Sequence, residues 1–192
     1  MPRVPLRAVA VLAAVSAILG GTVSACRFDT ATDTSRGSNE AVGLIAGREL
    51  SVEAASYCPS GFGSPDDVTL VLSSRSDDCD AHRKQVARPD ATTLTLHLVQ
   101  VTGAGTFRVT RGARGPGDAL VRFSALDDDC DESVVRDADG GAVTVTGIDA
   151  SSDGFIKGSF DVTFDGERLR GDFDTSVCTV DYFCGQPTEC EK

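Results

Sequence analysis

Two acidic segments carry the side chains best suited to chemistry: SDDCD at 76–80 and DDDCDE at 127–132. Carboxylate oxygens are the ligands that calcium prefers, so we predict a calcium site at Asp127, Asp129 and Asp131. If the two segments meet in space, their carboxylates must repel or share a cation. Neither segment has the sixth-position Gly or the twelfth-position Glu of a 12-residue calcium loop. Solvated acidic loops are therefore the alternative interpretation.

Catalysis has little support in the sequence. The chain has two histidines, His82 and His97, as candidate bases near neutral pH. His97 is predicted to face outward from its strand, with no partner that the sequence identifies. Gly-x-Ser-x-Gly, His-Glu-x-x-His and metal-spaced Cys/His sets are all missing from the sequence. Arg111 and Arg114 lie in a Gly-rich loop where they could hold an anion, with a solvated loop as the alternative. We predict no enzymatic activity and no cofactor other than the possible calcium.

The elements that position these residues are predicted to be strands. Thr- and Val-rich alternating runs are separated by Gly-, Pro- and Asp-rich turns, which is typical of antiparallel sheets. The predicted strands cover 41–46, 49–56, 68–73, 92–101, 105–111, 119–126, 141–148, 155–164 and 168–177. The only helix candidate is short, at 81–86. The expected fold is all-β, an antiparallel sandwich or flattened small barrel of about 8–9 strands over residues 40–180.

One hairpin can be predicted residue by residue. Asp165-Gly166 between alternating runs favours a two-residue type I′ turn. That turn fixes the facing pairs as Phe164/Glu167, Val162/Leu169, Asp161/Arg170, Phe160/Gly171, Gly158/Phe173 and Lys157/Asp174. Phe160 and Phe173 are each expected to lie over the facing glycine and shield its backbone. The Arg-Gly-Asp tripeptide at 170–172 then lies within a regular strand, so we interpret it as structural rather than adhesive.

Seven cysteines occur in the chain. Six of them suit three bridges in an oxidising compartment, which leaves one to explain; the six are Cys58, Cys79, Cys130, Cys178, Cys184 and Cys190. The sequence does not choose among the possible pairings. Our expected set is Cys184–Cys190, Cys130–Cys178 and Cys58–Cys79, with Cys79–Cys130 as an alternative that would bring the acidic segments together. Residues 181–192 are expected to form a cysteine-containing tail.

The first 25 residues are predicted to be a signal peptide. Arg3 and Arg7 precede an apolar run at 8–19 that is too short to span a bilayer. The following Val23-Ser24-Ala25-Cys26 resembles the lipobox of bacterial lipoproteins. This resemblance implies that Cys26 is lipidated and becomes the mature N-terminus, with 26–39 as its tether. An ordinary signal peptide that leaves Cys26 as a plain thiol is the alternative.

A second resemblance concerns the C-terminal hairpin. GSFDVTF at 158–164, LRGDF at 169–173 and Cys178, together with the lipobox, resemble uncharacterised bacterial lipoproteins. Those proteins have a β-rich domain that ends in a Gly-x-Phe hairpin and a cysteine. The resemblance implies a fold and a location, and it carries no known activity.

The net charge of the mature chain limits the classes of partner that we expect. Without Arg3 and Arg7 the mature chain carries 16 basic and 29 acidic residues, a net charge of −13. Such a surface argues against nucleic acid and against electrostatic docking on anionic lipids. We therefore expect an extracytoplasmic, lipid-anchored protein of structural or ligand/partner-binding type. The sequence does not identify its protein or small-molecule partner. Arg27 after Cys26 favours the outer membrane if the host has two membranes. A calcium-dependent binding module and a hydrolase of envelope polymers are the alternatives.

Overall fold

The computed structural model describes residues 39–59, 64, 66–112, 115–151, 153–178 and 189–191. All of them belong to the compact unit Ser35–Lys192. The predicted signal peptide, Cys26, nearly all of the tether, Arg114 and Cys184 lie outside the described residues. None of the described helices is long and apolar enough to span a bilayer.

The described residues form strands and one short helix. The strands of the first half are β1 (Glu40–Val42), β2 (Leu44–Ile45), β3 (Arg48–Glu49), β4 (Ala54–Pro59), β5 (Val68–Ser73), β6 (Val86–Ala87) and β7 (Thr92–Leu98). Those of the second half are β8 (Gly105–Val109), β9 (Asp118–Leu126), β10 (Glu132–Asp137), β11 (Gly140–Asp149), β12 (Phe155–Phe164), β13 (Glu167–Ser176) and β14 (Glu189–Cys190). The helix α1 spans Asp78–Lys84.

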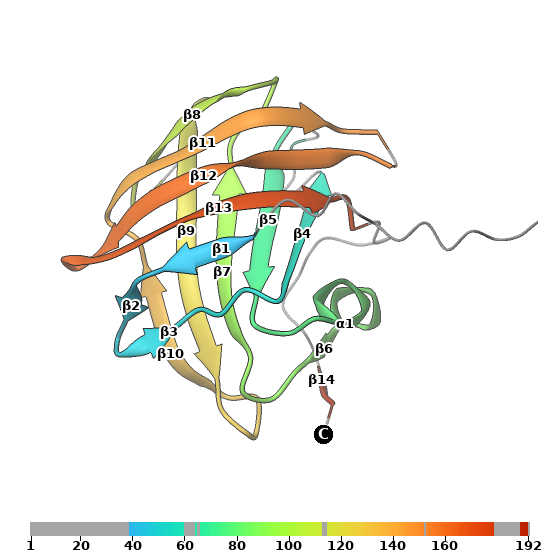
Figure 1. Ribbon diagram of the computed structural model, residues 1–192, viewed down its shortest axis with the longest axis vertical. Coiled ribbons are helices and arrows are strands. Elements are labelled where there is room, and N and C mark those ends of the chain that lie inside the picture. Colours follow the sequence, from blue (N-terminus) through green and yellow to red (C-terminus); the bar gives the residue numbers. More distant parts are fainter. Residues whose placement is uncertain are drawn as a thin grey trace, which may run out of the picture. The chain divides into compact units, whose positions relative to one another are not determined.

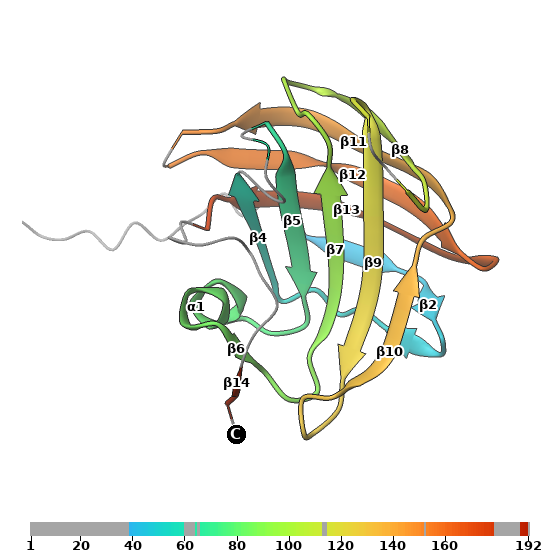
Figure 2. The same ribbon diagram turned by 180° about the vertical axis from the view of Figure 1, so that it is seen from behind.

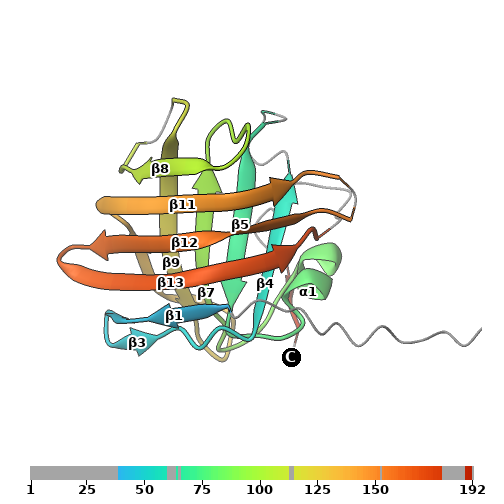
Figure 3. The same cartoon turned by 45° about the horizontal axis from the view of Figure 1, so that its top comes forward.

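Ten strands make one sheet in the order β1-β13-β12-β11-β8-β9-β7-β5-β4, with β10 paired to β9. The sheet curls so that β4, β5, β7 and β9 run across β11, β12 and β13 (Figures 1 and 2). Figure 3 shows β8, β11, β12, β13 and β1 side by side over the other layer. At one end β4 reaches β13, where the Cys178 N–H donates to the Tyr57 carbonyl oxygen at 2.9 Å. The predicted all-β, disulfide-stapled fold is confirmed, as a half-barrel.

The core fills the space between the two layers. Leu94, Leu96 and Leu98 alternate along β7 and are fully buried. Phe123 of β9 meets Phe164 of β12 edge to face, with ring centroids 6.3 Å apart, so this pair joins the two layers. Such a pair adds a little to the free energy gained from burying the two rings.

The predicted hairpin register is confirmed at every facing pair of β12 and β13. Asp165 and Gly166 have φ values of 50° and 94°, as a type I′ turn requires. Each Phe lies over its facing glycine, because a Cβ on Gly171 would meet the Phe160 ring at 2.8 Å. Asp161 faces Arg170 as expected, but its ion pair is diagonal, with Arg168, whose Nε donates at 2.6 Å.

The Arg-Gly-Asp tripeptide lies inside the sheet. Its strand β13 has β12 on one side and β1 on the other, and β1 pairs with it from Arg170 to Asp172. The segment is therefore a regular interior strand, in agreement with the structural interpretation.

Several elements differ from the sequence expectation; among them, the short strands β6 and β14 were not predicted, and the predicted strand at 41–46 is divided into β1 and β2. The strand β10 was not predicted, because its edge position leaves it charged at both ends and it carries a bulge after Glu132. The predicted strand at 49–56 is wrong for residues 50–53, which join β3 to β4. The helix begins at Asp78 rather than Ala81, since Asp78 and Asp80 favour its positive N-terminal end.

The disulfide pairs also differ. The described bridges are Cys79–Cys178 and Cys130–Cys190, and Cys58 is disulfide-bonded as well. All the expected pairings are wrong: Cys184–Cys190, Cys130–Cys178, Cys58–Cys79 and the alternative Cys79–Cys130. The reason is tertiary, because α1 packs beside β4 at the point where β13 ends.

Candidate functional site

Both histidines of the chain lie on the outer face of the curled sheet, each beside a buried aspartate. His97 is on β7 and contacts Asp67, just before β5. His82 is on α1 and contacts Asp78, which reaches β4. We call these four residues, with Thr69 and Ser56, the outer-face His–Asp pairs; they are the strongest candidate site among the described residues.

The His97 pair includes a hydroxyl. His97 faces Thr69 across β5 and β7, and its Nδ1 lies 3.3 Å from the Thr69 Oγ1. Its Nε2 lies 3.7 Å from an Asp67 carboxylate oxygen, while the other oxygen of Asp67 accepts from the Gln100 N–H at 3.0 Å. Burial lowers the pKa of His97, and the charge of Asp67 opposes that shift without cancelling it.

The lowered pKa of His97 predicts a pH dependence of stability. As the pH falls through the ordinary histidine value of about 6.5, the unfolded chain takes up a proton first. The free energy of unfolding should therefore decrease from about pH 6.5 downward, until the pH reaches the lower folded pKa. Urea unfolding at several pH values checks this. His97→Gln should remove that part of the decrease and His82→Gln should retain it; equal profiles for wild type and His97→Gln would contradict the assignment.

The second pair joins α1 to β4. Ser56 Oγ donates to Asp78 Oδ2 at 3.0 Å, and the His82 Nε2 lies 3.2 Å from the same oxygen. That nitrogen is buried and makes no hydrogen bond, so its contact with Asp78 is a close approach only, and the hydrogen bond from Ser56 is the one that holds Asp78. The carboxylate thus fixes the helix on the outer face of the sheet.

The chemistry of these pairs follows from their burial. In the His97 pair, hydroxyl, imidazole and carboxylate follow one another as in an activated nucleophile, whereas in the His82 pair the carboxylate lies between the hydroxyl and the imidazole. However, Thr69 and Ser56 are each only 2 % exposed, so a substrate cannot reach either oxygen in this structure. The pairs therefore act as buried polar contacts, one joining β5 to β7 and the other joining α1 to β4.

The calcium candidate residues lie in the turn between β9 and β10. The Asp127 carboxylate accepts from the N–H groups of Asp129 and Asp131, at 3.0 and 2.9 Å. It is therefore directed into its own turn. Within the described part of the chain, no group of three or more His, Cys, Asp or Glu side chains is arranged to hold a metal ion. The calcium site stays a prediction from sequence.

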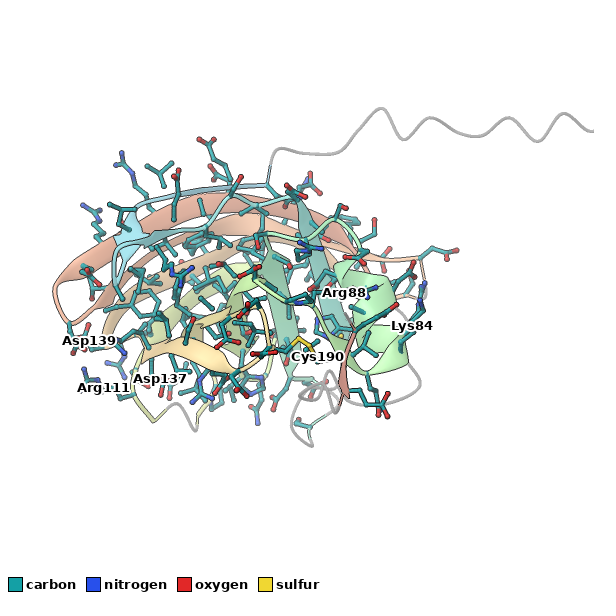
Figure 4. All side chains as sticks on the ribbon, turned by 90° about the horizontal axis from the view of Figure 1, so that it is seen from below. Lys84, Arg88, Arg111, Asp137, Asp139 and Cys190 are labelled. Carbon is teal, nitrogen blue, oxygen red and sulfur yellow. A yellow bond between two sulfur atoms is a disulfide. The ribbon has the colours of Figure 1, made fainter. Side chains whose placement is uncertain are left out.

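The two acidic segments are connected indirectly, through Arg88 and a disulfide. Arg88 Nη2 lies 2.7 Å from Asp77 in the first segment, and Arg88 also pairs with Glu191. Glu191 follows Cys190, which is bridged to Cys130 of the second segment. Figure 4 shows Arg88 and Cys190 at this end of the domain. An arginine and a disulfide thus connect the carboxylate-rich segments.

Arg111, the candidate anion-binding residue, is occupied by the protein's own carboxylates. Its Nη2 lies 2.6 Å from Asp165 and 3.5 Å from Asp139, and Figure 4 shows Arg111 beside Asp139. The pKa of Asp139 is lowered first by the hydrogen bond from the Thr163 hydroxyl, and also by the Asp165 N–H and the charge of Arg111. This group holds the tip of the β12–β13 hairpin.

The sequence did not indicate Asp67, Thr69 or Ser56, and it placed Asp78 in an acidic segment without its serine and histidine partners, because these contacts depend on how β4, β5, β7 and α1 align. A comparison of the chain with family models, with curated proteins and with solved structures finds no match.

Proposed function

We propose that the protein is a lipid-anchored envelope protein whose β domain serves as a structural or partner-binding module outside the cytoplasm. The observation that carries the proposal is the pair of long-range disulfides, Cys79–Cys178 and Cys130–Cys190. Such bridges form and persist in oxidising compartments. They account for four cysteines, Cys58 is bonded as well, and Cys26 follows a lipobox-like sequence.

The burial of the candidate nucleophiles supports a non-catalytic role. Thr69 and Ser56 point into packed contacts rather than into a cleft. A half-barrel stapled by disulfides suits a domain that presents a fixed surface to a partner.

Lipidation is tested by labelling the full chain with radioactive palmitate in a bacterial host. Wild type should incorporate label and fractionate with membranes, and Cys26→Ser should lose the label and appear in the soluble extracytoplasmic fraction. Ser24→Ala keeps a small residue in the lipobox-like sequence and should still be labelled. Unlabelled wild type, or labelled Cys26→Ser, would refute the proposal. Separation of inner and outer membranes in the same cells reports which of them holds the protein.

A further inference from the structure

The two most exposed large apolar side chains among the described residues are neighbours. Leu44 is 57 % exposed and Val42 is 49 % exposed, whereas Leu120 and Phe155 are each 38 % exposed and lie on other strands. Val42 ends β1 and Leu44 begins β2. They are therefore among the first residues after the segment that leads from Cys26.

The fold holds these two side chains outward. Gly43 lies between them with φ of 143°, and a Cβ there would be 2.2 Å from the Arg168 carbonyl oxygen. Only glycine allows this approach of β1 to β13. Ile45, the next residue after Leu44, is fully buried in the core. Packing on both sides of the pair therefore fixes Val42 and Leu44 at the surface.

A cation accompanies the apolar pair. Arg170 faces Val42 across β13 and β1, so both side chains emerge on the same outer face. We call Val42, Leu44 and Arg170 the β1–β2 corner. Apolar side chains beside an arginine suit the boundary between lipid headgroups and acyl chains, where the guanidinium stays with the phosphates.

The anchor places a bilayer within reach of this corner. Twelve residues separate Cys26 from Asn39, and a fully extended chain of that length spans at most about 40 Å. A lipid at Cys26 also keeps the domain at high local concentration near the membrane, so a weak second contact suffices to orient it.

We propose that the β1–β2 corner docks on the membrane that carries the lipid anchor, so that the domain lies against the bilayer in one orientation. This inference rests on the lipidation in the proposed function. Glu40 and Asp172 flank the corner, so the matching surface is a zwitterionic one rather than an anionic one. Burying the exposed halves of two aliphatic side chains favours the docked orientation about thirty-fold.

Single-tryptophan variants test this docking directly, because the chain has no Trp. Lipidated Leu44→Trp is reconstituted in phosphatidylcholine vesicles, with and without brominated acyl chains. The Trp at position 44 should emit at shorter wavelength and lose about half of its emission to the bromine, since docked side chains enter the headgroup boundary. Leu120→Trp is the matched control, with an exposed leucine on β9, and should be unaffected. Val42→Trp replaces Leu44→Trp if circular dichroism shows that the latter does not fold.

The outcomes separate the two proposals. Mass spectrometry of the same sample reports the lipid on Cys26. If the lipid is present and positions 44 and 120 are quenched equally, the docking is overturned and the anchoring stands. If the lipid is missing, both are overturned. If Leu44→Trp in a Cys26→Ser background already emits at shorter wavelength without vesicles, the chain itself or a second copy covers the corner, which also overturns the docking.

Discussion

Replacing Cys79 and Cys178 together by serine is expected to lower the free energy of unfolding by about 4–5 kcal/mol. The bridge joins residues 99 positions apart, so its loss releases a long loop in the unfolded chain. The folded state loses a buried contact as well, since Cys178 is 1 % exposed. Urea unfolding of the purified domain measures the difference.

Cys26→Ser is the control for this prediction. It also removes one cysteine, but under the proposed lipidation Cys26 carries the lipid and forms no disulfide, and it takes no part in either described bridge, so the free energy of unfolding should not change. A loss smaller than about 1 kcal/mol for the double variant would mean that the bridge constrains the unfolded chain far less than its loop length implies.

Gly158→Ala is expected to destabilise the domain by about 3 kcal/mol, which lowers the melting temperature by about 6–12 °C. A Cβ on Gly158 would lie 1.9 Å from the Thr144 carbonyl oxygen and 2.7 Å from the Phe173 ring. Neither neighbour can easily make room for the added methyl group. The Phe173 ring would have to leave the core, and the Thr144 oxygen belongs to the backbone of β11. The central strands β11, β12 and β13 must therefore separate locally. Differential scanning calorimetry measures the shift.

Gly103→Ala is the matched control for Gly158→Ala. No atom lies within 4 Å of its added Cβ, so the same chemical change should leave stability unchanged or raise it by about 0.5 kcal/mol. If both variants melted at the wild-type temperature, the close approach of β11 to Gly158 would be refuted.

The features that were predicted correctly from the sequence are those that depend on residues close together in the chain. Asp165-Gly166 fixes a turn, and the turn fixes every facing pair along β12 and β13. Alternating leucines place β7 with one face in the core. These features need only neighbouring residues, and for that reason the all-β fold and its hairpin were predictable.

The sequence failed where distant elements meet. The Cys79–Cys178 bridge depends on α1 lying at the joint end of β4 and β13, and no local signal specifies that position. His97 gains Thr69 and Asp67 only once β5 and β7 are aligned. The acidic segment at 127–132 indicates a loop and hides the strand that follows it. In that strand, β10, Val134 and Val135 pair with β9.

The contact of β4 with β13 has a consequence for the order in which the domain assembles. Strands β11, β12 and β13 follow one another along the chain and pair as neighbours, so they can form early at low entropic cost. Tyr57 and Cys178 lie far apart along the chain, so their contact closes a long loop at a higher entropic cost. We therefore expect the pairing of β11, β12 and β13 to precede the contact of β4 with β13, which the Cys79–Cys178 bridge then secures.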